Sequence, residues 1–348
     1  MGFRESFLEQ AEKHPAMEAQ DAVKLCYQAA FGAEHLLRDK DAAYRYLERE
    51  YESVEADSGP LYEQIHETVC RVNLAAWKRE GLPLEWLFRM FAETAANPPE
   101  NGEQVFRDCL DTVGGLIRER IIGITAEQWD GFLSNYPVHQ PQALHHSESY
   151  RNREHPAYRL VCSRFIRIFP ILRAIAGMAQ KPKIIALDGR AASGKTTLAD
   201  QLARVTGAGV AHMDDFFLPP GLRTEERLAE PGGNVHYERF LEEVLPFLKS
   251  PQAFRYRCFD CSRMEFGEVR EIPEGNLRIV EGAYSCHPLF GDHMGLKVFC
   301  DVEPREQLRR IRRRNGAQML ERFRDSWIPM EERYFQHFQI REHANLTV

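Results

Sequence analysis

The spacing of hydrophobic residues changes near the middle of the chain. Up to residue 180, apolar positions recur every three or four residues, as in "DAVKLCYQAAFGAEHLL", where Ala22, Leu25 and Ala29 share one helical face. Turn signals separate the successive runs, at 57–60, 81–83 and 97–102. The pattern predicts an all-helical domain over residues 1–180, ending in a helix kinked near Pro170.

From Lys183 onward, short β-rich runs alternate with helical ones. The predicted strands are Lys183–Leu187, Gly209–His212, Phe254–Phe259, Leu277–Val280 and Leu296–Cys300. The predicted helices are Lys195–Val205, Tyr237–Leu248, Arg305–Arg314 and Met319–Phe338. This alternation predicts an α/β domain over residues 181–348, a mostly parallel sheet with helices on both faces.

The stretch "GRAASGKT" matches the phosphate-binding pattern G-x-x-x-x-G-K-[ST] in full. Its glycines let the backbone turn tightly and direct several N–H groups at one phosphate. The following helix contributes its positive dipole end, the lysine a mobile charge and the threonine a hydroxyl ligand for Mg²⁺. A plain glycine turn before a helix is the alternative. We expect ATP and Mg²⁺ here, with the nucleotide contacting Gly189, Ala191, Ala192, Ser193, Gly194, Lys195, Thr196 and Thr197.

Carboxylates follow two of the predicted strands, Asp214 and Asp215 in "HMDDFF" and Glu281 in "IVEGAYS". Ligands gather at the carboxyl ends of parallel strands. A carboxylate there could accept the proton of an attacking hydroxyl and bind Mg²⁺. We therefore expect one of the two aspartates to be catalytic, and Thr196, Glu281 and an aspartate carboxylate to hold the metal. A turn-capping Asp pair and an exposed strand-end glutamate are the alternatives.

The helix "REQLRRIRRRNG" is rich in arginine. Phosphoryl transfer needs positive charge over the moving group, and arginines on a lid are one way to supply it. We expect Arg309 and Arg313 to act with Lys195 in catalysis, although a solvated basic face is the usual reason for such a helix. The absence of N-K-x-D and L-S-G-G-Q sequences argues against a GTPase and a transporter ATPase.

Together these segments resemble the uridine kinase family, which also holds phosphoribulokinase and bacterial pantothenate kinase. The resemblance covers about Lys183 to Val348 and rests on "GRAASGKTT", "HMDDFF", "GGNVHYERF", "IVEGAYS", the arginine-rich helix and "WIPMEERYF". It implies that Asp214 is the general base and that Thr196 and Glu281 complete the magnesium site. It also implies that arginines among Arg309, Arg310 and Arg313 close over the phosphates.

The acceptor side departs from that family. Members that phosphorylate nucleosides usually carry "F-D-H-P-D", whose Asp grips the ribose. The matching stretch here is "GGNVHYERF", with Asn234, Val235 and His236 around that position. The family's Tyr-Asp segment near the base becomes Phe259-Asp260. Asn234, His236, Tyr237, Asp214 and Asp260 are thus the candidate acceptor contacts. The changes count against uridine and cytidine and leave the phosphate machinery intact.

In the helical half, Glu63 and His66 are three residues apart and could share a helix face at metal-ligand distance. Glu34 and His35 are a further acidic and histidine pair. Solvated polar faces are the more ordinary interpretation of both. This half matches no enzyme motif, and we interpret it as an accessory domain that shapes the acceptor pocket or mediates association.

Composition narrows the classes of function. The 348 residues carry a net charge of −7, which counts against a general nucleic-acid role. No apolar run is long enough to cross a bilayer and no signal-peptide core is present, so we expect no membrane partner and a cytoplasmic protein. The lone CxxC at Cys258 and Cys261 favours reduced thiols over a zinc site. A homo-oligomer is compatible with the sequence.

The leading hypothesis is an ATP-dependent kinase that phosphorylates a hydroxyl of a small, nucleoside-like molecule. A kinase of a non-nucleoside metabolite, with a pantothenate-like or sugar-phosphate-like acceptor, is the first alternative. An ATP-binding sensor without an acceptor is the second. The size of the space beside Asp214 discriminates between the kinases and the sensor.

Overall fold

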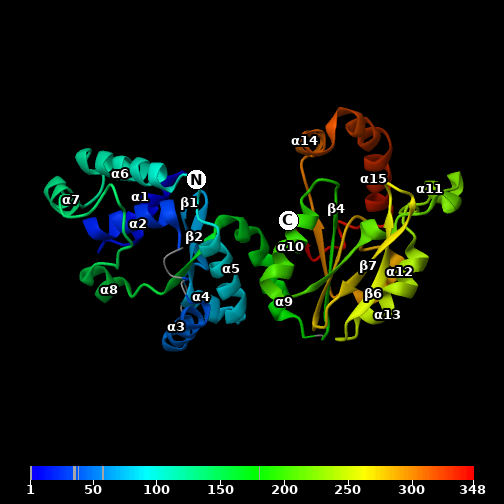
Figure 1. Ribbon diagram of the computed structural model, residues 1–348, viewed down its shortest axis with the longest axis horizontal. Coiled ribbons are helices and arrows are strands. Elements are labelled where there is room, and N and C mark those ends of the chain that lie inside the picture. The colour runs from blue at the N-terminus through cyan, green and yellow to red at the C-terminus, as the bar shows by residue number, and fades with distance from the viewer. Residues whose placement is uncertain (1, 34–36, 38, 57–58, 180) are drawn as a thin grey trace. The chain divides into compact units, whose positions relative to one another are not determined.

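The protein divides into two compact units, Met1–Ile166 and Arg167–Val348. The computed structural model describes residues 2–33, 37, 39–56, 59–179 and 181–348, so Glu34 and His35 lie outside the described residues. Figure 1 shows the elements of each unit. The boundary precedes the one expected at residue 180, because helix α9 (Phe169–Gly177) packs against strand β9 (Leu296–Cys300) of the second unit.

The first unit is mostly helical but contains a small antiparallel sheet of order β1-β2-β3. Its helices are α1 (Phe3–Lys13), α2 (Ala19–Phe31), α3 (Lys40–Ser53), α4 (Leu74–Arg79), α5 (Leu84–Ala96), α6 (Gly102–Arg118), α7 (Ala126–Leu133) and α8 (Glu148–Glu154). Its strands are β1 (Tyr62–His66), β2 (Val69–Asn73) and β3 (Tyr158–Cys162), and the 3-10 helix η2 (Ser163–Ile168) follows.

The all-helical prediction was wrong over these strands. Ile65, Val69, Val72 and Val161 are β-branched and buried, and such side chains favour a pleated sheet. In a short run their spacing is compatible with a buried helix as well as with a buried strand, so periodicity could not separate the two. The single kinked helix expected near Pro170 is likewise β3, η2 and α9 in succession.

The hydrophobic core of the first unit lies where α1 and α2 pack against β1, and where α2 packs on α6. Polar residues interrupt this packing, among them Arg71 on β2, which is 4% exposed. Glu63 and His66 do not form a metal-binding pair, because Glu63 contacts His14 at 3.5 Å whereas His66 contacts Thr68 at 2.8 Å. Across the described residues, no group of three or more His, Cys, Asp or Glu side chains is placed to hold a metal ion.

The second unit is an α/β domain with a P-loop. Its sheet strands are β4 (Lys183–Gly189), β5 (Gly209–His212), β8 (Leu277–Glu281), β9 and β10 (Leu346–Thr347), and a hairpin is formed by β6 (Phe254–Asp260) and β7 (Glu265–Ile272). Its α-helices are α9, α10 (Lys195–Thr206), α11 (Glu225–Ala229), α12 (Tyr237–Glu243), α13 (Leu245–Leu248), α14 (Pro304–Arg322) and α15 (Ile328–His337). Short 3-10 turns are η3 (Met213–Phe216), η4 (Pro220–Leu222) and η5 (Pro288–His293), and η6 (Phe323–Trp327) is a π-helical turn.

The five sheet strands run in the order β10-β9-β4-β8-β5, and every neighbouring pair is parallel. The strand predictions at 183, 209, 277 and 296 are confirmed within two residues. The predicted strand at 254 exists, but it pairs with β7 in the separate hairpin and not in the sheet. Because β4 lies between β8 and β9, its carboxyl end opens at the middle of the sheet edge, where ligands of such folds gather.

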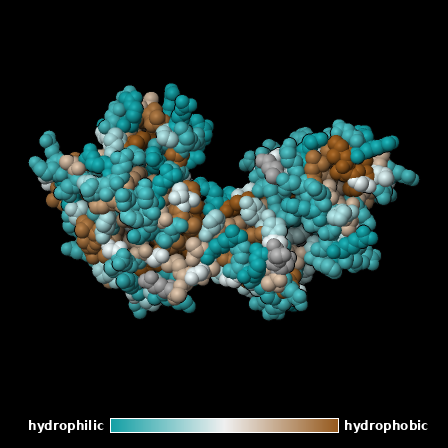
Figure 2. Space-filling view, turned by 180° about the vertical axis from the view of Figure 1, so that it is seen from behind, coloured by the Kyte–Doolittle hydropathy of each residue, from teal (hydrophilic) through white to brown (hydrophobic). Residues whose placement is uncertain are grey.

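Hydrophilic residues cover most of the face shown in Figure 2, and hydrophobic residues occur on it in separate patches. The largest exposed apolar fractions belong to Tyr46 at 61% and Val269 at 59%. No helix within the described part of the chain has the length and apolar character that a membrane span requires.

Candidate active site

The P-loop connects the end of β4 to the start of α10. Gly189 is required by the neighbouring strand: a Cβ there would lie 2.1 Å from the Cys300 carbonyl oxygen of β9. Gly194 then turns into the helix with a φ of 95°. The ammonium of Lys195 folds back under the loop and donates to the carbonyl oxygens of Gly189 and Arg190, at 2.8 and 2.9 Å. Two backbone carbonyl groups of the loop thus hold its lysine in place.

Residues of the two C-terminal helices hold the loop from the other side. Gln307 of α14 donates to the Ala191 carbonyl oxygen at 3.1 Å, and Arg310 donates to the Ala192 carbonyl oxygen at 3.2 Å. Glu331 of α15 accepts from the Ala191 amide at 2.9 Å. The Ser193 hydroxyl is buried and has no hydrogen-bond partner among the described residues. The loop backbone is therefore held by side chains of α14 and α15, while the Ser193 hydroxyl is available for a ligand.

Glu331 carries the most unusual carboxyl group of the site. Burial raises its pKa to about 7, against the opposing effects of Lys195 and the Ala191 amide, while Asp188 and Asp214 raise it further. The side chain is 8% exposed. A proton can therefore bind and leave this group near neutral pH.

Asp188, the residue before Gly189, is fully buried and connects three segments. Its carboxylate accepts from the amides of Gly189, Tyr284 and Cys286 at 2.7, 3.1 and 2.9 Å. It also accepts from the Tyr334 hydroxyl of α15 at 2.9 Å. Burial raises its pKa although these bonds favour the charged form. Asp188 positions the loop, the turn after β8 and α15 relative to one another.

The two aspartates after β5 have different roles. Asp215 is held in place: it accepts from the Tyr256 hydroxyl at 2.8 Å and from Arg270 Nε at 2.9 Å. Asp214 is exposed to solvent, and none of the described residues forms a hydrogen bond or ion pair with its carboxylate. Arg239, which is 5% exposed, donates to the Asp215 backbone oxygen and fixes the turn that carries both.

The Asp214 side chain is exposed to solvent, yet nearby protein partly desolvates its carboxyl group. This partial desolvation raises its pKa, and the nearby carboxylate of Glu281 raises it further, while Lys195 and His212 lower it. Because the pKa of Asp214 responds to both Lys195 and Glu281, its carboxyl lies at the same edge of the sheet as the P-loop. Gly282 allows that approach, since a Cβ there would lie 2.8 Å from the Met213 Cβ.

Thr196, Glu281 and His212 form the third part of the site. The Thr196 hydroxyl donates to Glu281 Oε1 at 3.0 Å, and His212 Nδ1 lies 2.7 Å from Glu281 Oε2. Glu281 is 5% exposed. The Thr196 hydroxyl and the carboxylates of Glu281 and Asp214 are hard oxygen donors, which Mg²⁺ prefers. Glu281 also raises the pKa of Asp214, and a divalent cation bound to both carboxylates would offset this repulsion. The residues present fit Mg²⁺.

Of the acceptor candidates, Asn234 is the best placed to bind a ligand. It is 8% exposed, and its Oδ1 has no hydrogen-bond partner among the described residues. His236 instead caps α12 by accepting from the Arg239 amide at 3.3 Å. Tyr237 is contacted by Arg227 and stacks on His287. Asp260 accepts from the Ser262 amide at 2.8 Å and from its hydroxyl at 2.6 Å, which fixes the β6–β7 turn.

The arginines of α14 also differ in whether they contact the P-loop. Arg309 pairs with Glu306 through Nε at 2.6 Å, and its side chain is 69% exposed. Arg313 is exposed, as is Thr197 on α10. Arg310 is the arginine of α14 that reaches the P-loop, while its Nε pairs with Glu306 at 2.7 Å.

Several residues of this site had no counterpart in the sequence analysis. His212 could have been found, because it closes a predicted strand beside Asp214. Asp188 precedes the P-loop at another strand end and carried the same signal. Glu331 and Gln307 carried none, since they reach Ala191 from 140 and 116 residues away along the chain.

No family model matches the chain. Among solved structures, it is similar to a possible uridine kinase from Bacillus stearothermophilus, with 19% identity and a TM-score of 0.40, over 52% of this chain and 97% of that one. It is also similar to a proposed fructose transport system kinase from Silicibacter sp. TM1040, with 21% identity and a TM-score of 0.41, over 51% of this chain and 95% of that one.

Proposed function

We propose that the second unit is an ATP-dependent kinase that transfers the γ-phosphate to a hydroxyl group of a small molecule. The observation that carries the proposal is the Asp214 carboxylate, unpartnered among the described residues, which interacts electrostatically with Lys195 of the P-loop and with Glu281. A base in that place is next to the position of the terminal phosphate. Its raised pKa suits a group that must accept a proton in the reaction.

The chain's own residues divide the work. Lys195 exchanges the two loop carbonyls for phosphate oxygens, because an ammonium binds a phosphate more strongly than a neutral carbonyl. Asp214 orients the acceptor hydroxyl and takes its proton. Thr196 and Glu281 would hold Mg²⁺, with Asp214 beside them. When bound, the ion neutralises charge on the β- and γ-phosphates.

We assign the nucleoside part of ATP to a hollow beside the P-loop. It has a volume of about 380 Å³ and is lined by Arg190, Asp301, Val302, Glu303, Pro304, Arg341, Thr347 and Val348. Arg190 is the first variable residue of the loop, and it pairs with Asp301 at 2.9 Å and with Glu332 at 2.7 Å. A nucleotide whose phosphates follow the loop backbone reaches this hollow at its other end.

The acceptor we propose first is nucleoside-like, with one of its donor groups bound by Asn234 Oδ1. A non-nucleoside acceptor is the alternative, and the hydrogen bonds of Asp260 favour it. Asp260, which would face a nucleobase by the family resemblance, already accepts three hydrogen bonds, two from Ser262 and one from the Arg263 amide.

The test is ATP consumption by the full-length protein with nucleosides, pantothenate, sugars and sugar phosphates as acceptors. Stimulation by one compound identifies the acceptor class, whereas ATP binding without stimulation by any acceptor supports a sensor. Asp214→Asn should retain ATP binding and lose about 10²- to 10⁴-fold in transfer. Asp200→Asn, an exposed aspartate of α10, is the matched control. Equal turnover of the two variants would remove Asp214 from the mechanism.

A further inference from the structure

The first unit contains a buried polar cluster that the proposed kinase chemistry does not use. At its centre is Arg71 of β2, which is 4% exposed. Its guanidinium donates to Gln28 Oε1 from Nε and from NH2, at 3.1 and 2.7 Å, and to Gln10 Oε1 from NH1 at 2.9 Å. It also lies over the Tyr158 ring, 4.5 Å from its centroid. A buried cation is thus held by neutral partners only.

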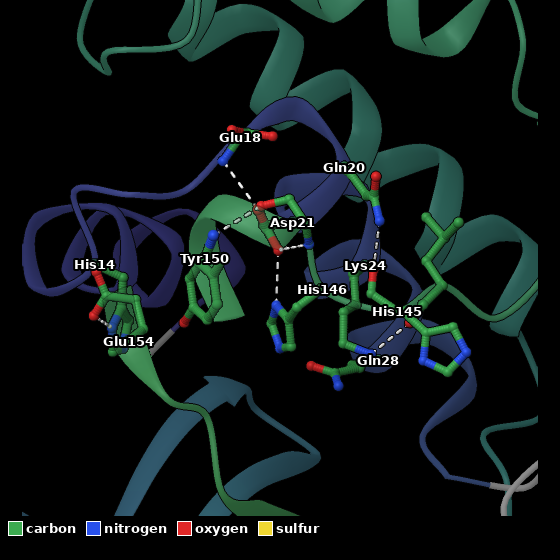
Figure 3. Close-up of polar contacts among 12 residues, drawn as sticks. His14, Glu18, Gln20, Asp21, Lys24, Gln28, His145, His146, Tyr150 and Glu154 are labelled. Carbon is green, nitrogen blue, oxygen red and sulfur yellow. Dashed lines mark hydrogen bonds and ion pairs between the residues drawn. The ribbon is translucent and has the colours of Figure 1, made fainter. Parts of the chain in front are cut away.

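A second cation belongs to the same cluster. Asp21, Lys24 and Gln28 project from α2 in the close-up of Figure 3, and Lys24 donates to the Leu144 carbonyl oxygen at 2.6 Å. Burial lowers the pKa of Lys24 to about 8, and Arg71 lowers it further, while Asp21 opposes the shift. Within the described residues, neither Lys24 nor Arg71 forms an ion pair with a carboxylate. Buried charges in proteins are normally paired.

Two carboxylates lie beside these cations, Asp21 and Glu63, and both already have partners. Asp21 accepts from His146 Nδ1 and the Ser147 amide through Oδ1, at 2.8 and 3.0 Å. Its Oδ2 accepts from the Ser147 hydroxyl at 2.7 Å and from the Glu18 amide at 3.1 Å, so all its acceptor positions are filled. Figure 3 shows the bonds to Glu18 and His146.

Glu63 is the other carboxylate, since it lies opposite Arg71 in the sheet register. It accepts from Gln10 Nε2 at 3.0 Å and contacts Lys13 and His14 at 3.8 and 3.5 Å. Gln10 therefore separates it from Arg71. Among the described residues, no carboxylate is therefore left to pair with Arg71 or Lys24.

His146, which bonds to Asp21, adds neither a negative nor a positive charge to the cluster. Burial lowers the pKa of His146 to about 4 in spite of its bond to Asp21, and Arg71 and Lys24 lower it further. His146 is therefore neutral, and its Nε2 lies 2.7 Å from the Tyr158 hydroxyl. Three of the five guanidinium N–H groups and one of the three ammonium N–H groups have the partners named above. The other N–H groups have no partner among the described residues.

We infer that the first unit binds an oxyanion, a carboxylate or phosphate group carried by a small molecule, between Arg71 and Lys24. Arg71 offers a planar pair of donors that suits either group. Lys24 gives a second positive charge, and the anion in turn stabilises its protonated form. The site is independent of the P-loop and does not require the kinase activity.

Calorimetric titration of the full-length Lys195→Ala variant with inorganic phosphate and with acetate tests the inference, because that variant weakens phosphate binding at the P-loop. We expect saturable binding of at least one anion at millimolar concentration. Lys24→Met in the same background should weaken it about tenfold or more, and Lys24→Arg should restore it. Arg49→Met, which removes an exposed charge of α3, is the matched control. Arg71→Met is less suitable, since it leaves Gln10 and Gln28 unpaired.

Amine labelling of the unmodified protein gives a second measurement. Lys24 should react readily near pH 8, and the anion that binds should slow its labelling and leave that of the exposed Lys40 unchanged. Protection by phosphate alone would identify a phosphate site, and protection by acetate alone a carboxylate site. Binding that is the same in Lys24→Met and Arg49→Met, or no binding of either anion, would show that the cluster is only structural.

Discussion

Replacing Glu331 by glutamine isolates the effect of one charge beside the P-loop. The glutamine keeps an oxygen that can accept from the Ala191 amide, the bond that Glu331 makes at 2.9 Å. It removes a carboxyl group that faces Lys195, Asp188 and Asp214. Because size and hydrogen bonding are nearly conserved, a change in stability with pH reports the charge.

The size of the effect follows from the pKa of Glu331, which burial raises from 4.5 to about 7. That rise corresponds to about 3 kcal/mol at 1.36 kcal/mol per pKa unit. The folded protein holds the proton to a higher pH than the unfolded chain does. The stabilising contribution is therefore complete below pH 4.5 and is lost as the pH rises through about 7. The variant has no such group, so its advantage over the wild type should grow by up to about 3 kcal/mol across this range.

Amide hydrogen exchange of β4 and β8, corrected for intrinsic rates at each pH, measures the opening free energy of the second unit. Glu321→Gln, at an exposed position of α14, is the control. Above pH 7 the Glu331→Gln variant should also bind ATP several-fold more tightly, because no buried carboxylate then repels the phosphates. A stability difference that stays constant between pH 4.5 and 7 would refute the argument.

Three further predictions concern the loop, the lid and the metal site. Gly189→Ala places a Cβ 2.1 Å from a backbone oxygen of β9, at a φ of 129°. It should destabilise the second unit by about 2 to 6 kcal/mol in thermal unfolding, whereas Gly177→Ala, with open space around it, should not. Arg310→Met should slow phosphoryl transfer about tenfold or more, and Arg309→Met much less, since only Arg310 contacts the loop; equal effects would count against this assignment. Thr196→Val should raise the Mg²⁺ concentration for half-maximal turnover about 10- to 100-fold, and an unchanged Mg²⁺ dependence would exclude the hydroxyl as a ligand.

The parts of the site that are local in sequence could be predicted. The P-loop motif follows from eight consecutive residues, and the pair Asp214–Asp215 and Glu281 follow from their position after apolar strands. The division between Asp214 and Asp215 could not be predicted, because it depends on Tyr256 and Arg270, which are 41 and 55 residues away along the chain. Identical residue types in adjacent positions carry no information about which one is held.

The first unit shows a different limit of sequence reasoning. Arg71 occupies an inward position on a strand that the apolar spacing assigned to a helix, so its burial was not foreseeable. Its partners lie on α1 and α2, 61 and 43 residues away. Only the tertiary structure shows that the polar residues of these three elements meet, and that Arg71 and Lys24 are left without a carboxylate among the described residues.

In the second unit, the loop that we propose to bind ATP is held by the same helices that we expect to form the lid. Gln307 and Arg310 of α14 bind its carbonyl oxygens, and Glu331 of α15 binds its amide. α14 is kinked at Gly316, which has a φ of 82°, and the loop contacts of Gln307 and Arg310 lie in the half before the kink. Phosphates that draw Lys195 away from the loop carbonyls would also bring negative charge close to Glu331. Protonation of Glu331, or displacement of α15, would relieve that repulsion, so we expect the proposed nucleotide binding to be coupled either to proton uptake or to movement of α15.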